Sequence, residues 1–409
     1  MIRELKVYLD AREVGVLVYK KGYIYFEYDK EFLTTDIEIS PVKLPLQSGV
    51  FRCEDDTFEG LWGVFADSLP DGWGRFLMDR EFQRKGIKLQ DISPLDRLAI
   101  VGKDGMGALR YEPVSAYKSV VDDIILDDLA HSSSEILKGS SEEMIDELFT
   151  LGGSSAGARP KILVQVSDDF ATIIDSKKPL EDGFSHYIIK FASRYDSKDI
   201  ALVEYVYNQM AQKAGLEVPQ FHLFEGKKGY YFGAKRFDRL GEKRVHMHSV
   251  AGVIHSDFRY PALDYDDLLK LTLYLTKSLK EQEKLYRLAC FNLFAHNRDD
   301  HAKNFSYLLD NKHRWVLSPT YDLTYSFGPG GEHSTTYMQE GKKPTIEHLV
   351  QLAQTNGIEG YKTIIDEVKE AVFSWRELAR DVGVSKLKIA DVQKSIQNNI
   401  TRSHSPEWE

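Results

Sequence analysis

The sequence predicts an α+β protein with two lobes, preceded by a small antiparallel β domain. Short runs of alternating apolar and polar residues occupy positions 1 to about 50, and a second group of strand-like runs lies between residues 161 and 239. From Asp264 onward, apolar residues recur at helical spacing instead. The expected domains are residues 1–112, 113–255 and 256–409, of which the last is the helical lobe.

Composition narrows the classes of function. The 409 residues include 63 acidic and 53 basic side chains, for a net charge of −10, which argues against tight unaided binding to nucleic acid. With Cys53 and Cys290 as its two cysteines, the chain has no disulfide framework. The opening residues lack the apolar core of a signal peptide, and no apolar run reaches membrane-spanning length, so we expect a cytoplasmic protein.

The amino-terminal region reads as strands followed by a helix. The strands are expected at residues 5–9, 14–19 and 23–28. The segment Leu-Pro-Asp-Gly-Trp-Gly-Arg at residues 69–75 leads into a helix that ends near Gly86. We interpret that segment as a structural turn whose tryptophan fills a core.

Residues 112–140 are acidic and rich in serine, which is typical of a connector between domains. After them, Ser140 and Glu143 form a capping pattern that predicts a helix running through Phe149.

A loop rich in glycine and small residues follows, at residues 151–161. Its backbone could approach phosphate groups closely and donate amide hydrogen bonds to them. It is not a Walker loop, because Gly157 is followed by Ala158 and Arg159 and because a strand, expected at residues 161–166, comes next. The alternative interpretation is an ordinary turn.

Lys190 lies within an apolar strand at residues 186–191. A buried ammonium group there requires an anion as its partner, such as an ATP phosphate. The alternative is an edge lysine that points to solvent. Glu204, on a helix expected at residues 198–214, could pair with Lys190. The next hairpin, residues 220–239, would end where a kinase holds adenine.

The stretch His-Asn-Arg-Asp-Asp-His-Ala-Lys-Asn-Phe-Ser at residues 296–306 carries the most specific pattern. Asp299 and Asn304 stand five residues apart, as the base and the magnesium-binding asparagine do in protein kinases. A hairpin between them and Asp322 would bring that second carboxylate back beside Asn304. The alternative is a polar loop without catalytic duty.

Three histidines, His246, His248 and His255, invite a metal interpretation, but no carboxylate or cysteine stands at a spacing that completes a familiar zinc set. Further helices are expected around residues 364–378 and 384–400.

With these pieces in this order, the sequence resembles the HipA family of bacterial toxin kinases, whose two-lobed protein-kinase-like fold is shared with phosphatidylinositol 3- and 4-kinases. The likeness covers nearly the whole chain. Its motifs are LPDGWGR (69–75), GGSSAGARPK (152–161), HYIIK (186–190), KRFDR (235–239), DDHAKN (299–304) and YDL (321–323).

The resemblance implies a serine/threonine-protein kinase that uses ATP and Mg²⁺. Asp299 corresponds to the catalytic base, Asn304 and Asp322 to the metal ligands, and Lys190 to the lysine that contacts phosphate. Ser154 matches the serine that such kinases autophosphorylate, with Ser155 as a second candidate. The nucleotide-binding residues implied are Ser154, Ser155, Ala156, Gly157, Ala158, Lys190, Lys235, Phe237, His301 and Lys303, with Phe237 in the adenine hinge.

The resemblance also implies partners. Family members pair with a small helix-turn-helix antitoxin, and the pair binds operator DNA, so we expect DNA binding only through that partner. The best-known relatives phosphorylate glutamyl-tRNA synthetase. Here Asp300 replaces their glycine, and Ser155, Arg159 and Pro160 change their loop, so a translation-related substrate, such as an aminoacyl-tRNA synthetase, is expected without being specified.

Two alternatives remain open at this point. Aminoglycoside and homoserine kinases use an Asp-x-His-x-x-Asn loop like that of Asp299 to Asn304, so the chain could be a small-molecule phosphotransferase. It could also be a catalytically silent scaffold that holds a DNA-binding partner.

Overall fold

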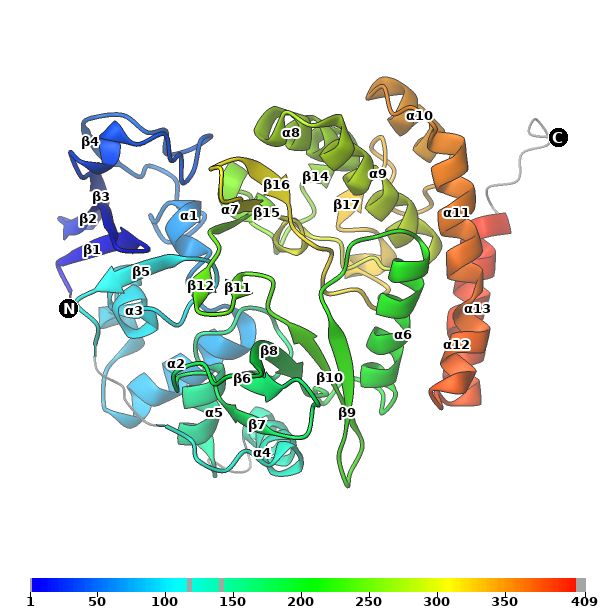
Figure 1. Ribbon diagram of the computed structural model, residues 1–409, viewed down its shortest axis with the longest axis horizontal. Helices are drawn as coiled ribbons and strands as arrows, with labels where there is room; N and C mark the ends of the chain where they lie inside the picture. Colours follow the sequence, from blue (N-terminus) through cyan, green and yellow to red (C-terminus); the bar gives the residue numbers. More distant parts are fainter. Residues whose placement is uncertain (1, 116–119, 140–142, 402–409) are drawn as a thin grey trace. The chain divides into compact units, whose positions relative to one another are not determined.

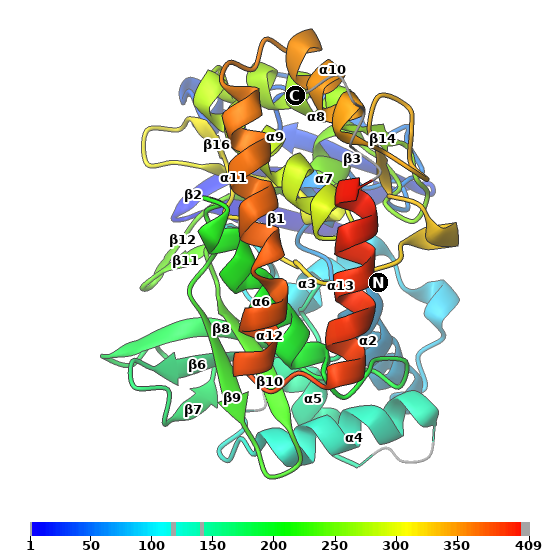
Figure 2. The same ribbon diagram turned by 90° about the vertical axis from the view of Figure 1, so that its right-hand side faces the viewer.

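The computed structural model describes residues 2–115, 120–139 and 143–401 (Figures 1 and 2). The chain forms two compact units. The first comprises Met1–Lys198, His222–His255 and Leu308–His313, and the second comprises Asp199–Phe221, Ser256–Tyr307 and Arg314–Glu409.

The first unit opens with a five-stranded antiparallel sheet in the order β4-β3-β2-β1-β5. Alternate residues of its strands point into a core, as Leu5 and Val7 do on β1, which confirms the period-two pattern of the sequence. The strands are β1 (Glu4–Leu9), β2 (Arg12–Lys20), β3 (Tyr23–Tyr28), β4 (Val50–Arg52) and β5 (Leu109–Glu112). Helices α1 (Gly63–Ala66), α2 (Gly72–Arg84) and α3 (Pro94–Val101) lie between β4 and β5 in the sequence.

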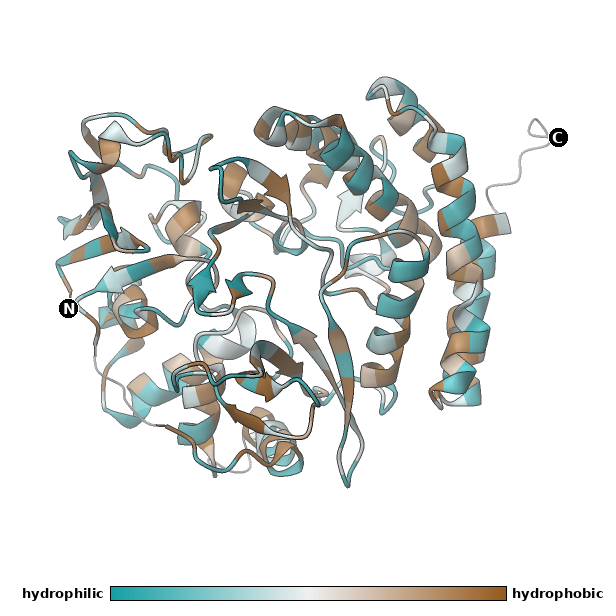
Figure 3. Ribbon diagram, in the orientation of Figure 1, coloured by the Kyte–Doolittle hydropathy of each residue, from teal (hydrophilic) through white to brown (hydrophobic). Residues whose placement is uncertain are grey.

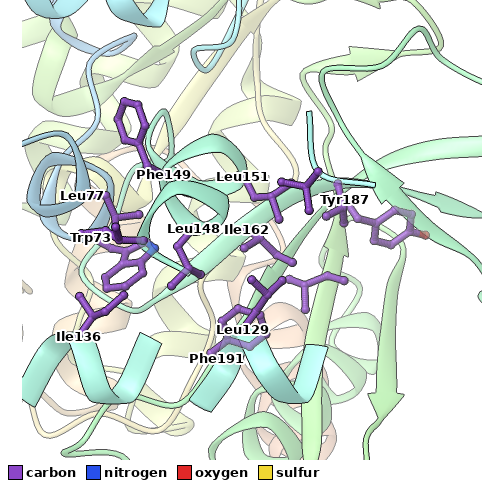
Figure 4. Close-up of a cluster of buried hydrophobic side chains, with 14 of the residues drawn as sticks. Trp73, Leu77, Leu129, Ile136, Leu148, Phe149, Leu151, Ile162, Tyr187 and Phe191 are labelled. Atoms are coloured by element: carbon purple, nitrogen blue, oxygen red, sulfur yellow. The ribbon is translucent and has the colours of Figure 1, made fainter. Parts of the chain in front are cut away.

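A second five-stranded sheet follows, in the order β7-β6-β8-β10-β9. Its strands are β6 (Lys161–Ser167), β7 (Ile173–Asp175), β8 (Phe184–Lys190), β9 (Phe221–Glu225) and β10 (Tyr230–Lys235). Strand β6 is buried along nearly its whole length, because side chains from α2 and α5 (Ile145–Gly152) join it in one hydrophobic cluster. Figure 4 shows Trp73 and Leu77 of α2 and Leu148 of α5 in that cluster.

The expected connector at residues 112–140 is wrong for its second half, which forms helix α4 (Leu126–Lys138). Leu129 and Ile136 stand seven residues apart, two helical turns, and both are buried in the hydrophobic cluster (Figure 4). The helix ends at Gly139, which is left-handed. Burial of this narrow apolar stripe outweighs a composition that otherwise resembles a linker.

The helix predicted through Phe149 is present as α5, but its predicted start at the Ser140 and Glu143 capping pattern is wrong, because the helix begins at Ile145 after a left-handed Met144. Ser140, the expected cap, lies outside the described residues. The first unit also contains β11 (Arg239–Leu240), β12 (Lys243–Arg244), β13 (Met247–Ser249) and α7 (Val250–Ile254).

The second unit is mainly helical. Its helices are α6 (Ile200–Lys213), α8 (Tyr265–Thr276), α9 (Leu279–Phe294), α10 (Ile346–Thr355), α11 (Tyr361–Phe373), α12 (Trp375–Asp381) and α13 (Lys386–Thr401). Helices α8 and α11 pack on α9, and α12 packs on α6 and α13. Helices α11 and α13 carry both hydrophobic and hydrophilic residues along their length (Figure 3).

The single helix expected at residues 364–378 is wrong, because it consists of α11 and α12 with a break at Ser374. The Ser374 hydroxyl donates to the Ala371 carbonyl at 2.6 Å, and its ψ of −4° departs from helical geometry. The unit also contains the two-residue parallel pair β14 (Leu263–Asp264) and β17 (Thr335–Thr336). No helix among the described residues has the length and apolar character needed to cross a membrane.

Candidate functional site

The residues around Asp299 form a closed loop after helix α9, named here the Asp299 loop (residues 296–304). The chain leaves the helix through His296, whose φ of 56° is left-handed, and ends the loop in one 3₁₀ turn, η3 (Ala302–Asn304). The Nδ1 atom of His301 accepts a hydrogen bond from the backbone N–H of Lys303 at 3.2 Å and so caps that turn.

Asn304 closes the loop, because its Nδ2 donates to the main-chain carbonyl of Asp299 at 2.6 Å. The amide nitrogen is thereby committed, which leaves the Oδ1 oxygen as the atom suited to a hard cation. The Asp299 side chain is 49% exposed, with its Oδ1 3.8 Å from Nε2 of His301. The five-residue spacing thus places an accessible carboxylate and a side-chain amide on one short loop.

The hairpin expected between Asn304 and Asp322 is present as β15 (Ser306–Leu309) and β16 (Trp315–Leu317). After it, the Tyr321 hydroxyl donates to the Lys303 carbonyl at 2.6 Å and lies 2.6 Å from the Ser306 hydroxyl. Tyr321, the residue before Asp322, therefore contacts the end of the Asp299 loop, and the predicted position of the Asp322 carboxylate beside Asn304 stays a prediction. Asp322 adopts a left-handed φ of 58°, uncommon for a residue other than glycine.

Two other predicted site residues of the loop contact Phe258. The ammonium of Lys303 lies 4.7 Å from the centre of the Phe258 ring, a cation–π distance. The His301 ring lies 5.5 Å from the same ring. Their assignment to nucleotide binding stays a prediction.

In the first unit, the glycine-rich loop (residues 152–160) joins α5 to β6. Ser155 is 1% exposed, and its hydroxyl donates to the Gly152 carbonyl at 2.6 Å, whereas Ser154 is half-buried. The ammonium of Lys161 donates to the Ala156 carbonyl at 2.6 Å, across the loop. The two serines therefore differ: the Ser155 hydroxyl is used to hold the loop.

The segment at residues 69–75 binds this loop, which the sequence did not reveal. The backbone N–H of Gly157 donates to the Asp71 carboxylate, and the Gly157 carbonyl accepts from the Trp73 backbone at 2.9 Å. Gly72 is required here, because a Cβ on it would lie 2.6 Å from the Gly157 carbonyl oxygen. Trp73 does fill a core, as expected, and its indole also donates to the Lys161 carbonyl at 3.1 Å. The segment at residues 69–75 is thus a turn that also binds the glycine-rich loop.

Lys190 ends strand β8 at the exit of the glycine-rich loop. It pairs with Lys161 of β6 and Phe232 of β10, and the next residue, Phe191, donates from its backbone to the Pro160 carbonyl at 2.8 Å. Lys190 is half-buried, and its ammonium lies 5.8 Å from the centre of the Phe232 ring. Glu204 belongs to α6 in the second unit, and its pairing with Lys190 stays a prediction.

The predicted adenine hinge includes Lys235, at the end of β10, and Phe237, which is half-buried. Asp238, which adjoins Phe237, is buried and accepts from the Arg239 guanidinium and from the Gly107 backbone, both at 2.8 Å. Burial alone would raise the pKa of Asp238, but the charges of Arg236 and Arg239 outweigh it and hold the pKa far below its usual range. Asp238 therefore joins this motif, residues 235–239, to the amino-terminal domain, and this role does not depend on what Lys235 and Phe237 bind.

The three histidines also contact the amino-terminal domain. His246 donates from Nε2 to the Ile39 carbonyl at 2.9 Å. His248 lies 2.7 Å from the Asp67 carboxylate, and His255 accepts from the Gly63 backbone at 3.0 Å.

No set of three or more His, Cys, Asp or Glu side chains that could hold a metal ion occurs in the part of the chain that the structure describes. The candidate oxygen ligands are Asn304, on the Asp299 loop, and Asp322, which follows the hairpin, and Mg²⁺ commonly adds water and substrate phosphates to ligands of this kind. The donor set thus fits a magnesium ion that arrives with a nucleotide. Both cysteines, Cys53 and Cys290, are buried and free.

Comparisons with known proteins agree with these motifs. The HipA N-terminal domain family matches residues 5–112, and the HipA-like C-terminal domain family matches residues 153–376. The solved complex of the Shewanella oneidensis MR-1 toxin antitoxin system HipA, HipB and its operator DNA contains a chain with a TM-score of 0.70 and 16% identity, covering 98% of this chain and 97% of that one. That likeness confirms the predicted two-lobed α+β fold with an amino-terminal β domain.

Two curated relatives share part of the sequence. "Putative kinase Y4dM" of Sinorhizobium fredii is 26% identical over 220 residues, which is 48% of this chain and 52% of the relative. A "Putative kinase" of Haemophilus influenzae is 24% identical over 187 residues, 42% of this chain and 52% of the relative. The chain therefore spans about half the length of these relatives.

Proposed function

The chain belongs to the HipA family, and from this membership we propose that it is an ATP- and Mg²⁺-dependent serine/threonine-protein kinase, the toxin of a toxin–antitoxin pair. One observation carries the proposal. The hydrogen bond from Asn304 to the Asp299 main-chain carbonyl closes a short loop that carries both an exposed carboxylate and a side-chain amide, and Asp322 follows a residue bonded to the same loop.

In this proposal, Asp299 accepts the proton of a substrate hydroxyl. Its half-exposed side chain is accessible to a substrate, as a general base must be. Asn304 and Asp322 would hold Mg²⁺, which neutralises the charge of the transferred phosphoryl group when bound.

The first unit would supply the nucleotide-binding groups. The glycine-rich loop offers backbone amides at residues 154–158, and Lys190, where the loop leads into the sheet, offers an ammonium for phosphate. Lys235 and Phe237 would contact adenine, and His301 and Lys303 are the further residues proposed to bind the nucleotide.

We propose Ser154 as the autophosphorylated serine. The Ser155 hydroxyl is buried and donates to the Gly152 carbonyl, so modifying it would break the loop's own hydrogen bond. Phosphate on Ser154 adds about −1.5 to −2 charge units at neutral pH and would repel nucleotide phosphates from the loop.

The proposed partners are a small helix-turn-helix antitoxin and a translation-related protein substrate, such as an aminoacyl-tRNA synthetase. The similar Shewanella chain was solved with HipB and operator DNA. Because this chain carries a net charge of −10, DNA contact would come through a basic partner. Sequence-specific promoter binding by the isolated chain would contradict this part of the proposal.

The metal assignment is tested with Asp322→Asn. Calorimetry with a non-hydrolysable ATP analogue should show weaker binding than wild type in the presence of Mg²⁺, with little difference in EDTA, because the substitution removes a negative ligand from the cation. Equal affinities of both proteins in Mg²⁺ would reduce Asp322 to a structural residue.

A further inference from the structure

The two neighbours of Asp299 are buried, although Asp299 itself is not. Arg298 is 7% exposed and Asp300 is 1% exposed, whereas the Asp299 side chain is 49% exposed. Burying a charged arginine or aspartate costs folding free energy unless hydrogen bonds compensate for the lost water. Their partners therefore show what holds the Asp299 loop in place.

Asp300 accepts four hydrogen bonds. Its Oδ1 accepts from the backbone N–H groups of Ser334 at 2.8 Å and Thr335 at 3.2 Å. Its Oδ2 accepts from the Tyr265 hydroxyl at 2.9 Å and lies 2.8 Å from Nδ1 of His333. The Thr335 hydroxyl in turn donates to the Asp300 carbonyl at 2.5 Å. Asp300 thus binds residues 333–335 through both its side chain and its main chain.

Arg298 binds the same part of the chain, residues 326–342, from the other side of Asp299. Its backbone N–H donates to the Ser326 carbonyl at 3.3 Å, and its carbonyl accepts from the Ser334 hydroxyl at 3.2 Å. Its guanidinium donates to the Gly331 carbonyl and, at 3.3 Å, to the Lys342 carbonyl. The 326–342 segment, which follows Asp322, therefore binds the chain on both sides of Asp299.

The opposite side of this network belongs to α8 and α9. The Tyr265 hydroxyl that donates to Asp300 accepts from Nδ2 of Asn292 at 2.9 Å. The Oδ1 atom of Asn292 accepts from Nδ2 of Asn297 at 2.9 Å. Asp300 therefore joins the 326–342 segment to the helices that precede the Asp299 loop.

We propose that Asp300 is a positioning residue for phosphoryl transfer: it fixes the main chain next to Asp299 by binding residues 333–335. This inference rests on the proposed kinase function. The carboxylate supplies three hydrogen bonds to residues 333–335 from within the chain itself. Displacement of a reacting group by about 1 Å can lower a rate by about 100-fold, which sets the expected size of the effect.

The first test measures steady-state kinetics of phosphoryl transfer for wild type, Asp300→Ala and Asp300→Asn. Asp300→Ala should lower kcat by about 100-fold and change the KM for ATP much less, because most of the proposed nucleotide contacts lie between residues 154 and 237, away from this loop in the sequence. Asp300→Asn should recover most of the activity, since an amide oxygen still accepts from the Ser334 and Thr335 backbones. Equal kcat for Asp300→Ala and wild type would overturn the proposal.

Asp264→Ala is the matched control. The Asp264 carboxylate also binds this segment, accepting from the Thr336 hydroxyl at 2.6 Å and from the Gln339 backbone at 2.7 Å. Its loss should loosen the segment away from Asp299 and change kcat much less than Asp300→Ala does. A loss of kcat as large as that of Asp300→Ala would mean that Asp300 acts only through general stability, which contradicts a positioning role.

Hydrogen exchange separates this inference from the proposed function, because it requires no catalysis. The Ser334 and Thr335 amides should exchange slowly in wild type and faster in Asp300→Ala. Unchanged exchange would refute the anchoring of residues 333–335. Faster exchange with unchanged kcat would refute the positioning role alone. If the wild-type chain transfers no phosphate, both the kinase proposal and the positioning role are refuted. The exchange rates would still show whether Asp300 binds residues 333–335.

Discussion

Asp71 accepts a hydrogen bond from the backbone N–H of Gly157, so the amino-terminal domain binds the glycine-rich loop directly. The Trp73 backbone N–H donates to the carbonyl of the same glycine, so both backbone polar groups of Gly157 are bonded to residues 71–73. The loop that would cradle ATP phosphates is therefore shaped by a segment 86 residues earlier in the chain.

We expect Asp71→Ala to weaken binding of a Mg²⁺-loaded ATP analogue by about tenfold, because losing the acceptor of the Gly157 amide costs about 1–1.5 kcal/mol and frees the loop. Asp71→Asn keeps an acceptor oxygen and should bind nearly as wild type does. Calorimetry of the three proteins checks this. If the alanine and asparagine variants bind equally well, the contact does not shape the nucleotide site.

The two loop serines should respond differently to substitution. Mass spectrometry of protein expressed in active form should find phosphate on Ser154, and Ser154→Ala should abolish that modification. Ser155→Ala should keep it and lower the free energy of unfolding by about 1 kcal/mol, since it removes the hydrogen bond to Gly152. Phosphate found mainly on Ser155 would contradict this assignment.

Stability of the first unit should depend on pH through His246. Burial lowers the pKa of His246 from 6.5 to about 4 in the folded state. The unfolded chain therefore binds more protons than the folded chain between about pH 4 and 6.5. The free energy of unfolding should be unaffected by this group above pH 6.5 and should fall by about 1.4 kcal/mol per pH unit as the pH drops toward 4.

Urea unfolding at several pH values between 4.5 and 7.5 measures this dependence. His246→Gln should reduce the slope of the curve below pH 6.5, because glutamine does not titrate and can still donate to the Ile39 carbonyl. Some slope should remain, because burial also lowers the pKa of His186 to about 4. His131→Gln, at an exposed position on α4, is the control and should keep the wild-type slope. Parallel curves for wild type and His246→Gln would rule out this histidine as the source.

Local patterns predicted much of the fold. Alternation predicted β1, β2 and β3 of the first sheet, whereas the short strands β4 and β5 were missed. The spacing of Asp299 and Asn304 singled out their loop but did not reveal the hydrogen bond between the two residues. Helix α4 was missed, because its acidic and serine-rich surface hides an apolar stripe of which Leu129 and Ile136 are two members.

The rest could not be predicted because it depends on contacts between distant parts of the chain. The KRFDR motif indicated an adenine site but gave no sign that Asp238 binds Gly107, 131 residues away. Likewise, Asp300 stood out only as a departure from glycine, and its role became visible once its carboxylate was seen bound to residues 333–335.

The central claim is that Asp299 is the base of a kinase, and transfer of labelled γ-phosphate from ATP by wild type and Asp299→Asn tests it most directly. Wild type should label itself on the glycine-rich loop. Asp299→Asn should lose about 100-fold or more of that transfer while binding the ATP analogue normally, because a base acts on the transition state rather than on nucleotide affinity. Transfer by Asp299→Asn at close to the wild-type rate would contradict the account.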